Sequence, residues 1–492
     1  MSPIDVLTAE FISRKTDLIE YEPLFRYLVS AYRSGYSFVE LSDTTLIPSV
    51  AIDSELVSLH DQIVAAFSKA ISEGLTSDYF VIEDSKLYLR RSYNTKKRIQ
   101  CELERLKGAV AKVHVDLQVA KRAVSETPSL NIQQAEAILY ALESSVATIS
   151  GGPGTGKTYT AGHLLKIFLE SSSGNARVGL SAPTGKAVAT LSKSIEKALN
   201  SQFDAKTLHA LLKIRPLGKD SNDPDFLPLD ILIVDECSMI DERLFERLLS
   251  RLATGTRLIL LGDPDQLPPI EPGAPFVELV QAQKCGHLEV CQRAELQSLV
   301  QFATYIRTRS TIQALEFAKQ GQGIDLQILD ENEMYAALQR ELATFTCHDM
   351  SSYTKRRLLT PIRTGRFGVE EINQAIYQKQ APGAAMPIMI LKNDYELDLA
   401  NGQIGILEGA RVSFETSNAP RVIPKVLLGP YEPAFCLSVH KSQGSEFDEV
   451  FLLLPSGSER FGRKMLYTAV TRTKKKLHIW TSEEVFRSCI EN

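Results

Sequence analysis

The 492-residue chain has no apolar run near the ~18 residues that a membrane-spanning helix needs. Residues 1–17 lack a basic start followed by an apolar core, which is the pattern of a secretory signal. Its seven cysteines are odd in number and scattered, with no Cys-x2-Cys pair, so neither a disulfide framework nor a zinc site is indicated. We therefore expect a cytoplasmic protein with free thiols and no membrane partner.

The chain also lacks an excess of positive charge, since its formal net charge is −5. Any contact with nucleic acid must then be local, and an enzyme that moves along a strand must also release it. No internal repeat is present, and no carboxylate cluster indicates a nuclease site. With 44% hydrophobic and 23% charged residues, the chain has the composition of a globular protein, and its length suggests about three domains.

What is present is a complete phosphate-binding loop. A strand-like run over 145–150 precedes it, and an apolar helical pattern follows it. Its glycines let backbone N–H groups approach phosphate oxygens, Lys157 reaches the β- and γ-phosphates, and Thr158 suits Mg²⁺. The sequence therefore predicts a nucleoside triphosphate site formed by Gly151, Gly152, Pro153, Gly154, Thr155, Gly156, Lys157 and Thr158.

An acidic pair follows a second strand-like run, at 231–234. Ligands of parallel sheets bind at the carboxyl ends of the strands, where Asp235 and Glu236 emerge. We expect Asp235 to hold Mg²⁺ and Glu236 to orient or deprotonate the attacking water, so that the reaction is hydrolysis.

Two further side chains are candidates for the phosphates. Gln266 follows the strand-like run 258–261 and would sense the γ-phosphate, although a turn of this composition is also a common structural device. Arg472 lies in the distal half and would stabilise charge on the transferred phosphoryl group, whereas an isolated arginine is more often solvated or paired.

Polar donors at other strand ends suit a nucleic-acid backbone. One group follows the run 178–182, His209 stands downstream, and a third group follows 435–439. Taken singly, such residues are more often caps, turns or structural histidines. The predicted DNA contacts are Pro183, Thr184, Gly185, Lys186, His209, His440, Lys441 and Ser442, with Glu446 beside the nucleotide.

Short apolar runs alternate with helical patterns in two series, which predicts two α/β domains with parallel sheets. The first series is 145–150, 178–182, 231–234 and 258–261, and the second is 358–360, 435–439, 450–454 and 477–480. The polar, proline-containing stretch 125–129 indicates a linker after a helix-rich region. We predict a helical N-terminal domain over 1–125, a nucleotide-binding domain over 126–290 and a second α/β domain over 291–492, with a small β insertion at about 400–432.

The motif order resembles that of superfamily 1 helicases, and more closely that of the RecD family. The segments that carry the resemblance are 151–158, 181–186, 234–241, 262–267, 439–447 and 467–472. It implies two RecA-like P-loop motor domains, an SH3-like form for the β insertion, and ATP with Mg²⁺ as cofactors. It also implies that Gln134 reads adenine, that Arg293 is a further phosphate-binding arginine, and that only a minimal strand-separating hairpin fits between His209 and Pro228.

The same resemblance implies an ATP-dependent 5′-to-3′ DNA helicase that acts on single-stranded and duplex-end DNA in double-strand break repair and recombination. It implies RecB-like and RecC-like partners in a heterotrimer, with any exonuclease activity in a partner. Two alternatives stay open, namely a regulatory subunit that uses the nucleotide as a switch, and a stand-alone RecD-like helicase. A P-loop kinase is disfavoured because it leaves the distal motifs unexplained.

Overall fold

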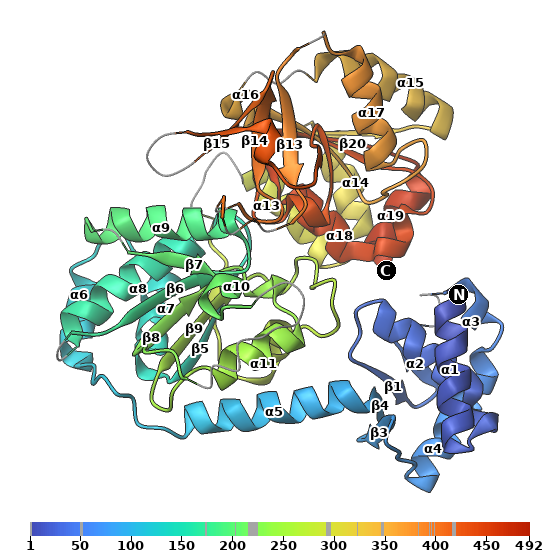
Figure 1. Ribbon diagram of the computed structural model, residues 1–492, viewed down its shortest axis with the longest axis horizontal. Coiled ribbons are helices and arrows are strands. Elements are labelled where there is room, and N and C mark those ends of the chain that lie inside the picture. Colours follow the sequence, from blue (N-terminus) through green and yellow to red (C-terminus); the bar gives the residue numbers. More distant parts are fainter. Residues whose placement is uncertain are drawn as a thin grey trace.

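The computed structural model places three groups of elements around a central junction (Figure 1). It describes residues 2–49, 53–172, 175–201, 203–214, 225–291, 297–321, 323–345, 349–381, 383–392, 394, 396–397, 399–415 and 420–492. Most of the segment expected to hold a strand-separating hairpin, residues 215–224, therefore lies outside the described residues.

The N-terminal unit combines helices with a sheet. Its helices are α1 (Pro3–Thr16), α2 (Glu22–Arg33), α3 (Ser54–Val57) and α4 (His60–Glu73). Its strands, β1 (Phe38–Ser42), β2 (Thr45–Ile47), β3 (Phe80–Glu83) and β4 (Lys86–Leu89), form an antiparallel sheet in the order β2-β1-β4-β3. The predicted helical N-terminal domain therefore also contains a sheet, because tight turns with positive φ at Asp43, Asp84 and Ser85 fold short runs into hairpins.

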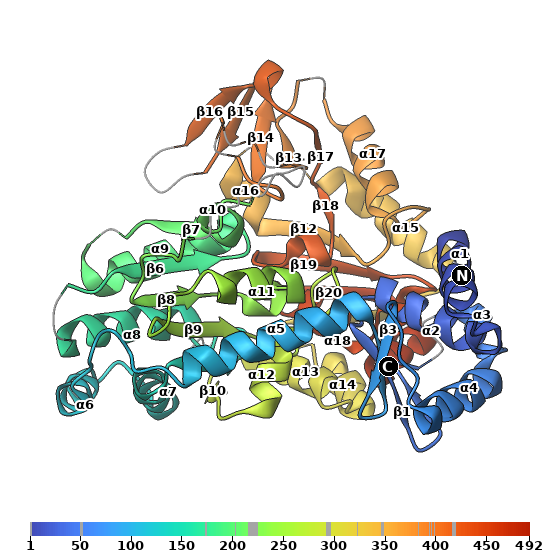
Figure 2. The same cartoon turned by 60° about the horizontal axis from the view of Figure 1, so that its bottom comes forward.

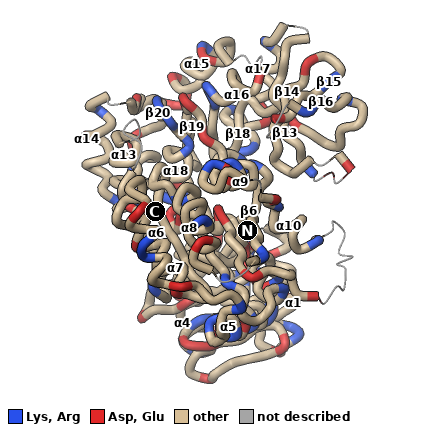
Figure 3. The backbone as a smooth tube through the Cα atoms, turned by 90° about the vertical axis from the view of Figure 1, so that its left-hand side faces the viewer, with Lys and Arg blue, Asp and Glu red and all other residues tan. Residues whose placement is uncertain are grey.

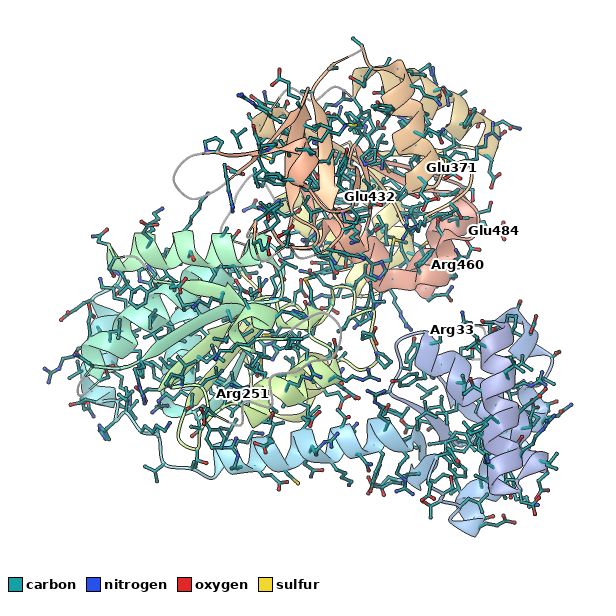
Figure 4. The ribbon with its side chains drawn as sticks, viewed as in Figure 1. Arg33, Arg251, Glu371, Glu432, Arg460 and Glu484 are labelled. Atoms are coloured by element: carbon teal, nitrogen blue, oxygen red, sulfur yellow. The ribbon has the colours of Figure 1, made fainter. Side chains whose placement is uncertain are left out.

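A long helix, α5 (Arg90–Lys107), leads from this unit to the first parallel sheet and runs along one side of it (Figure 2). Its residues Ile99, Leu103 and Leu106 recur at helical spacing and are buried in a cluster with α11 (Glu242–Ser250). Figure 4 shows Arg251, at the end of α11, directly above α5. The division between hydrophobic cores therefore lies before α5, earlier than the boundary predicted at about residue 125.

The first parallel sheet has six strands in the order β10-β5-β9-β8-β6-β7. The strands are β5 (Val146–Gly151), β6 (Val178–Ala182), β7 (Ala205–Thr207), β8 (Ile231–Val234), β9 (Arg257–Gly262) and β10 (Gly286–Leu288). The other helices around it are α6 (Leu117–Ser125), α7 (Ile132–Glu143), α8 (Lys157–Ser171), α9 (Gly185–Leu199), α10 (Leu208–Leu211) and α12 (Pro275–Ala282).

Both faces of this sheet are covered, as successive residues of β8 show. Ile231 and Ile233 pack into a cluster with α7, α8 and α9, whereas Leu232 and Val234 pack into the cluster of α5, α11 and α12. Because side chains alternate along a strand, an unbroken apolar run is what a doubly covered strand requires. The predicted parallel α/β architecture is confirmed.

The second parallel sheet has five strands in the order β11-β20-β19-β12-β18. The strands are β11 (Ile324–Ile328), β12 (Arg356–Thr360), β18 (Cys436–Ser438), β19 (Phe447–Leu454) and β20 (Thr473–Thr481). The helices of this part are α13 (Gln297–Arg307), α14 (Thr311–Lys319), α15 (Glu331–Glu341), α16 (Met350–Lys355), α17 (Val369–Lys379), α18 (Gly462–Val470) and α19 (Glu483–Glu491).

A small antiparallel sheet is inserted between β12 and β18, in the order β16-β15-β14-β13-β17. Its strands are β13 (Met386–Ile390), β14 (Ile404–Glu408), β15 (Arg411–Phe414), β16 (Arg421–Pro424) and β17 (Tyr431–Pro433). The insertion predicted at about 400–432 thus begins earlier, with β13, which pairs with β14 on one side and β17 on the other.

Among the residues that the structure describes, no helix is both long and apolar enough to span a lipid bilayer.

The docking of α5 generates a prediction for stability. Leu106 is fully buried against the first sheet's helices, so Leu106→Ala should lower the free energy of unfolding by about 2–5 kcal/mol, through lost burial and the cavity left behind. Lys107→Ala, at an exposed position on the same helix, is the matched control. The measurement is thermal and urea unfolding of both variants, and equal midpoints would show that α5 is not part of this core.

Candidate functional site

The predicted phosphate-binding loop joins β5 to α8. Gly154 and Gly156 have φ values of 72° and 83°, in the left-handed region that glycine adopts without strain. At Gly151 a side chain is excluded, because its Cβ would lie 2.6 Å from Thr155 Oγ1. The loop is thus a tight backbone turn that ends at the N-terminus of a helix, which suits an anion.

Lys157, the first residue of α8, folds back over this loop. Its Nζ donates to the carbonyl oxygens of Gly151, at 2.7 Å, and Gly152, at 3.1 Å. These two bonds hold the ammonium at the mouth of the loop, where phosphate oxygens bind in proteins with this motif.

Thr158 and the acidic pair meet across two neighbouring elements. Thr158 Oγ1 donates to Asp235 Oδ2 at 2.8 Å, and Asp235 Oδ1 accepts the Glu236 N–H at 2.8 Å. A hydroxyl and a carboxylate are the oxygen ligands that Mg²⁺ accepts, together with substrate phosphates. No group of three or more His, Cys, Asp or Glu side chains that could hold a metal occurs in the described residues. With few protein ligands, Mg²⁺ would complete its shell with waters and substrate phosphates.

Glu236 is held in an uncommon conformation. Its φ is 55°, the left-handed region, which costs a non-glycine residue energy and is often retained at functional sites. Burial raises the pKa of its carboxyl above the ordinary value, and Asp235 adds to the rise, whereas the positive charges of Lys157 and Arg472 oppose it. Its Oε2 atom is buried, with no hydrogen-bond partner among the described residues. Such an atom suits a water or an ion that the nucleotide brings.

Gln266 lies in the loop after β9 and is almost fully buried. Its Nε2 donates to Asp263 Oδ2 at 3.1 Å. Its Oε1, in contrast, is buried without a donor in the described part of the chain. The residue lines the same cleft as Glu236, as expected for a phosphate sensor.

Arg472 comes from the second sheet region, at the end of α18. It is buried, and its guanidinium donates to Thr468 O at 3.1 Å, Ser445 O at 3.4 Å and Thr471 Oγ1 at 3.1 Å. Its charge lowers the pKa of Glu236, which lies on the first sheet. The structure therefore brings together the acidic pair and an arginine more than 230 residues downstream.

Gln134, at the start of α7, is buried against the phosphate loop. Its Oε1 accepts the Asn131 N–H at 3.1 Å, and its Nε2 donates to Thr155 O at 3.2 Å. The carboxamide thus caps a helix and supports the loop. Reading of adenine by Gln134 stays a prediction.

Most residues of the predicted nucleotide site line a cleft of about 1900 Å³ between the two parallel sheets and the β insertion. Seven of the predicted DNA contacts line it: Pro183, Thr184, Gly185, Lys186, His209, His440 and Lys441. Glu446 also lines it and forms an ion pair with Lys474 at 3.5 Å.

Positive and negative charges are mixed along the chain, since Figure 3 shows Lys and Arg positions distributed among Asp and Glu positions. The titration of the basic residues in the cleft is therefore decided by their immediate surroundings. Desolvation, together with repulsion from Lys474 and Arg472, lowers the pKa of Lys186 to about 8. Burial also lowers the pKa of His209 and of His440, so neutral imidazoles line the wall at neutral pH.

One of the predicted DNA contacts is not among the residues that line the cleft in the described part of the chain. Ser442 is fully buried and its hydroxyl donates to Val439 O at 2.7 Å, so the hydroxyl does not face the cleft in this structure, and its contact with DNA stays a prediction. The hydroxyl instead closes the turn after β18, a common use of serine. Arg293 lies outside the described residues.

Contacts between the two sheet regions were not recognised in the sequence. Leu267, from the loop after β9, is buried in the hydrophobic core of the second sheet. Its N–H donates to Thr468 Oγ1 at 2.8 Å, and its carbonyl accepts Gln443 Nε2 at 3.1 Å. Lys464 Nζ donates to Pro264 O at 3.0 Å. Lys464 and Thr468, two polar positions on α18, were the available signal.

Comparisons with known proteins agree with this arrangement. Residues 134–272 match the AAA domain model, and residues 433–480 match the UvrD-like helicase C-terminal domain. These two segments carry the phosphate loop and acidic pair, and the distal motifs, respectively.

Three known proteins match most of the chain. The RecBCD enzyme subunit RecD of Mycobacterium tuberculosis is 31% identical over 407 residues, covering 73% of this chain and 70% of the relative. The RecD subunit of Buchnera aphidicola from Acyrthosiphon pisum is 26% identical over 587 residues, covering 99% of this chain and 96% of the relative. The ATP-dependent RecD2 DNA helicase of Deinococcus radiodurans is 30% identical over 378 residues, covering 73% of this chain and 50% of that protein. The chain therefore belongs to the RecD family of ATP-dependent DNA helicases.

Proposed function

We propose that this chain is a motor that moves 5′-to-3′ along single-stranded DNA, driven by hydrolysis of ATP, as the RecD subunit of a RecBCD-type complex. The observation that carries the proposal is the meeting of two half-sites. Glu236, which follows β8 of the first sheet, and Arg472, which follows α18 in the second sheet region, line one cleft, and this cleft continues to Thr184, Lys186 and His440. A site split in this way can link hydrolysis to movement of one sheet against the other.

In this proposal, each residue acts on the triphosphate from a fixed place. Lys157 leaves the loop carbonyls for the β- and γ-phosphates, and Glu236 takes a proton from the attacking water. Thr158 and Asp235 would hold Mg²⁺, which supplies positive charge to the phosphate oxygens. Arg472 stabilises the charge that develops on the transferred group.

Hydrolysis and release then loosen the cleft between the sheets. Thr184, Lys186 and His209 belong to the first sheet region, and His440 and Lys441 to the second, so opening and closing would alternate the grip on the strand. We infer two motor domains, one on each parallel sheet, with the N-terminal unit as the part that docks on RecB-like and RecC-like partners. Support for the partners comes from relatives named as RecBCD enzyme subunits, one of which aligns with 99% of this chain.

A stand-alone helicase is the second candidate, favoured by the similarity to the RecD2 helicase. A regulatory subunit that uses the nucleotide as a switch is the third. Displacement of streptavidin from single-stranded DNA separates the switch from the proposal, and purification of the native protein with or without partners separates the stand-alone helicase. We expect the chain, alone or in its native complex, to displace streptavidin from a biotinylated 3′ end and not from a 5′ end. Normal ATP binding without displacement would favour the switch. Purification of the native protein without large partner subunits would favour the stand-alone enzyme.

The nucleotide site generates a mutational prediction. Lys157→Ala and Glu236→Gln should each lower DNA-stimulated ATP hydrolysis by about 100-fold or more, because they remove a phosphate ligand and the general base. Lys166→Ala, on the same helix α8 but half-exposed, should leave turnover unchanged. The measurement is steady-state ATPase activity with and without single-stranded DNA. Full turnover by Lys157→Ala, with partner ATPases silenced, would contradict the site.

The raised pKa of Glu236 generates a pH prediction. A general base must be ionised, so kcat should rise with pH through a pKa above that of an ordinary glutamate, and should fall on the acid side. The residual activity of Glu236→Gln should lack this acid limb. The measurement is the pH profile of kcat at saturating ATP and DNA, and an identical limb in both proteins would assign the titration to another group.

A further inference from the structure

A buried hydrogen-bond network links the second sheet region to Gln266. Its centre is the carboxylate of Asp263, which is only 1% exposed. Asp263 accepts the Asp265 N–H, Gln266 Nε2 and the Tyr467 hydroxyl, each at 3.1 Å. Asp265 and Gln266 are in the same loop, whereas Tyr467 belongs to α18, the helix that leads to Arg472. One of the three donors therefore crosses between the sheets.

This network decides which way the carboxamide of Gln266 points. The NH2 end of Gln266 donates to the Asp263 carboxylate oxygen Oδ2, so the carbonyl oxygen of the carboxamide is turned away from Asp263. The opposite orientation would place two oxygens against each other. Gln266 Oε1 is accordingly a buried acceptor without a donor among the described residues.

The hydroxyl of Tyr467, on α18 of the second sheet region, lies against the first sheet region. It is buried, and a Cβ added to Gly152 would lie 3.2 Å from its hydroxyl oxygen, so the hydroxyl packs against the phosphate loop itself. Burial and the charges of Asp263 and Asp265 raise the pKa of this phenol, so it remains a donor at any physiological pH. Its bond to Asp263 exists only while α18 is seated on the first sheet.

We propose that Tyr467 is a positioning residue for hydrolysis: through Asp263 it orients Gln266, so that the Gln266 carbonyl oxygen accepts a hydrogen bond from the attacking water. The inference rests on the proposed function. It adds the contacts through which closure of the cleft would position Gln266 for hydrolysis of ATP. Seating of α18 brings Arg472 toward the phosphates and fixes Gln266 at the same time. DNA held across both sheets would thereby raise kcat and not the affinity for ATP.

Removal of the hydroxyl tests the inference. Tyr467→Phe keeps the ring and its packing but leaves Asp263 with one donor fewer. We expect DNA-stimulated kcat to fall about tenfold or more, as for loss of a hydrogen bond to a charged group, while KM for ATP stays within about twofold. Tyr140→Phe is the matched control. Its hydroxyl donates to Lys284 O within the first sheet region, so both parameters should stay as in the unmodified chain.

A double-mutant cycle separates action through Asp263 from other roles. If Tyr467 acts through Asp263, then Tyr467→Phe combined with Asp263→Asn should be no slower than Asp263→Asn alone. Additive losses, an unchanged kcat in Tyr467→Phe, or a rise in KM at constant kcat would each overturn the inference. Equal melting temperatures of the variants exclude a folding defect. The proposed function is judged separately, because Lys157→Ala abolishes turnover whether or not Tyr467 matters.

Discussion

The contact between the loop after β9 and the second sheet is the constraint on which the nucleotide cleft depends. Leu267 leaves the first sheet and is buried in the core of the second, and its backbone is bonded to Thr468 and Gln443. Leucine burial and two satisfied backbone groups favour one seating of α18 over others. Because Arg472 follows that helix, its distance from Glu236 is set by this contact.

The charges of the cleft depend on the same seating. Glu236 is buried in a left-handed conformation beside Asp235, an arrangement unfavourable by itself. The positive charges of Lys157, from the first sheet, and Arg472, from the second, offset it. Separation of the sheets removes one of these charges, and a triphosphate between them adds negative charge. The cleft is therefore sensitive to both closure and nucleotide, which is the property that a motor requires.

Much of the fold was predictable because the apolar runs are short, unbroken and followed by polar residues. The run Ile231–Val234 predicted both a doubly covered strand and the place where Asp235 and Glu236 emerge. Strands with an ambiguous sequence pattern were harder to predict. The N-terminal hairpins depend on two-residue turns within a helix-rich composition. β13 contains Pro387, a residue that usually argues against a central strand. Ser442 lies among polar donors in the sequence, but only the structure shows that its hydroxyl is bonded within a turn.

The sequence alone determined the phosphate loop, the acidic pair and the order of the motifs, because each depends on neighbours within a few residues. Tertiary structure decided what those motifs can do together. Only the packed chain shows α5 in the first core, Arg472 acting on Glu236, and Tyr467 bonded to Asp263 across the cleft. These contacts join residues far apart in the chain, and their geometry follows from how two sheets pack, which local sequence does not encode.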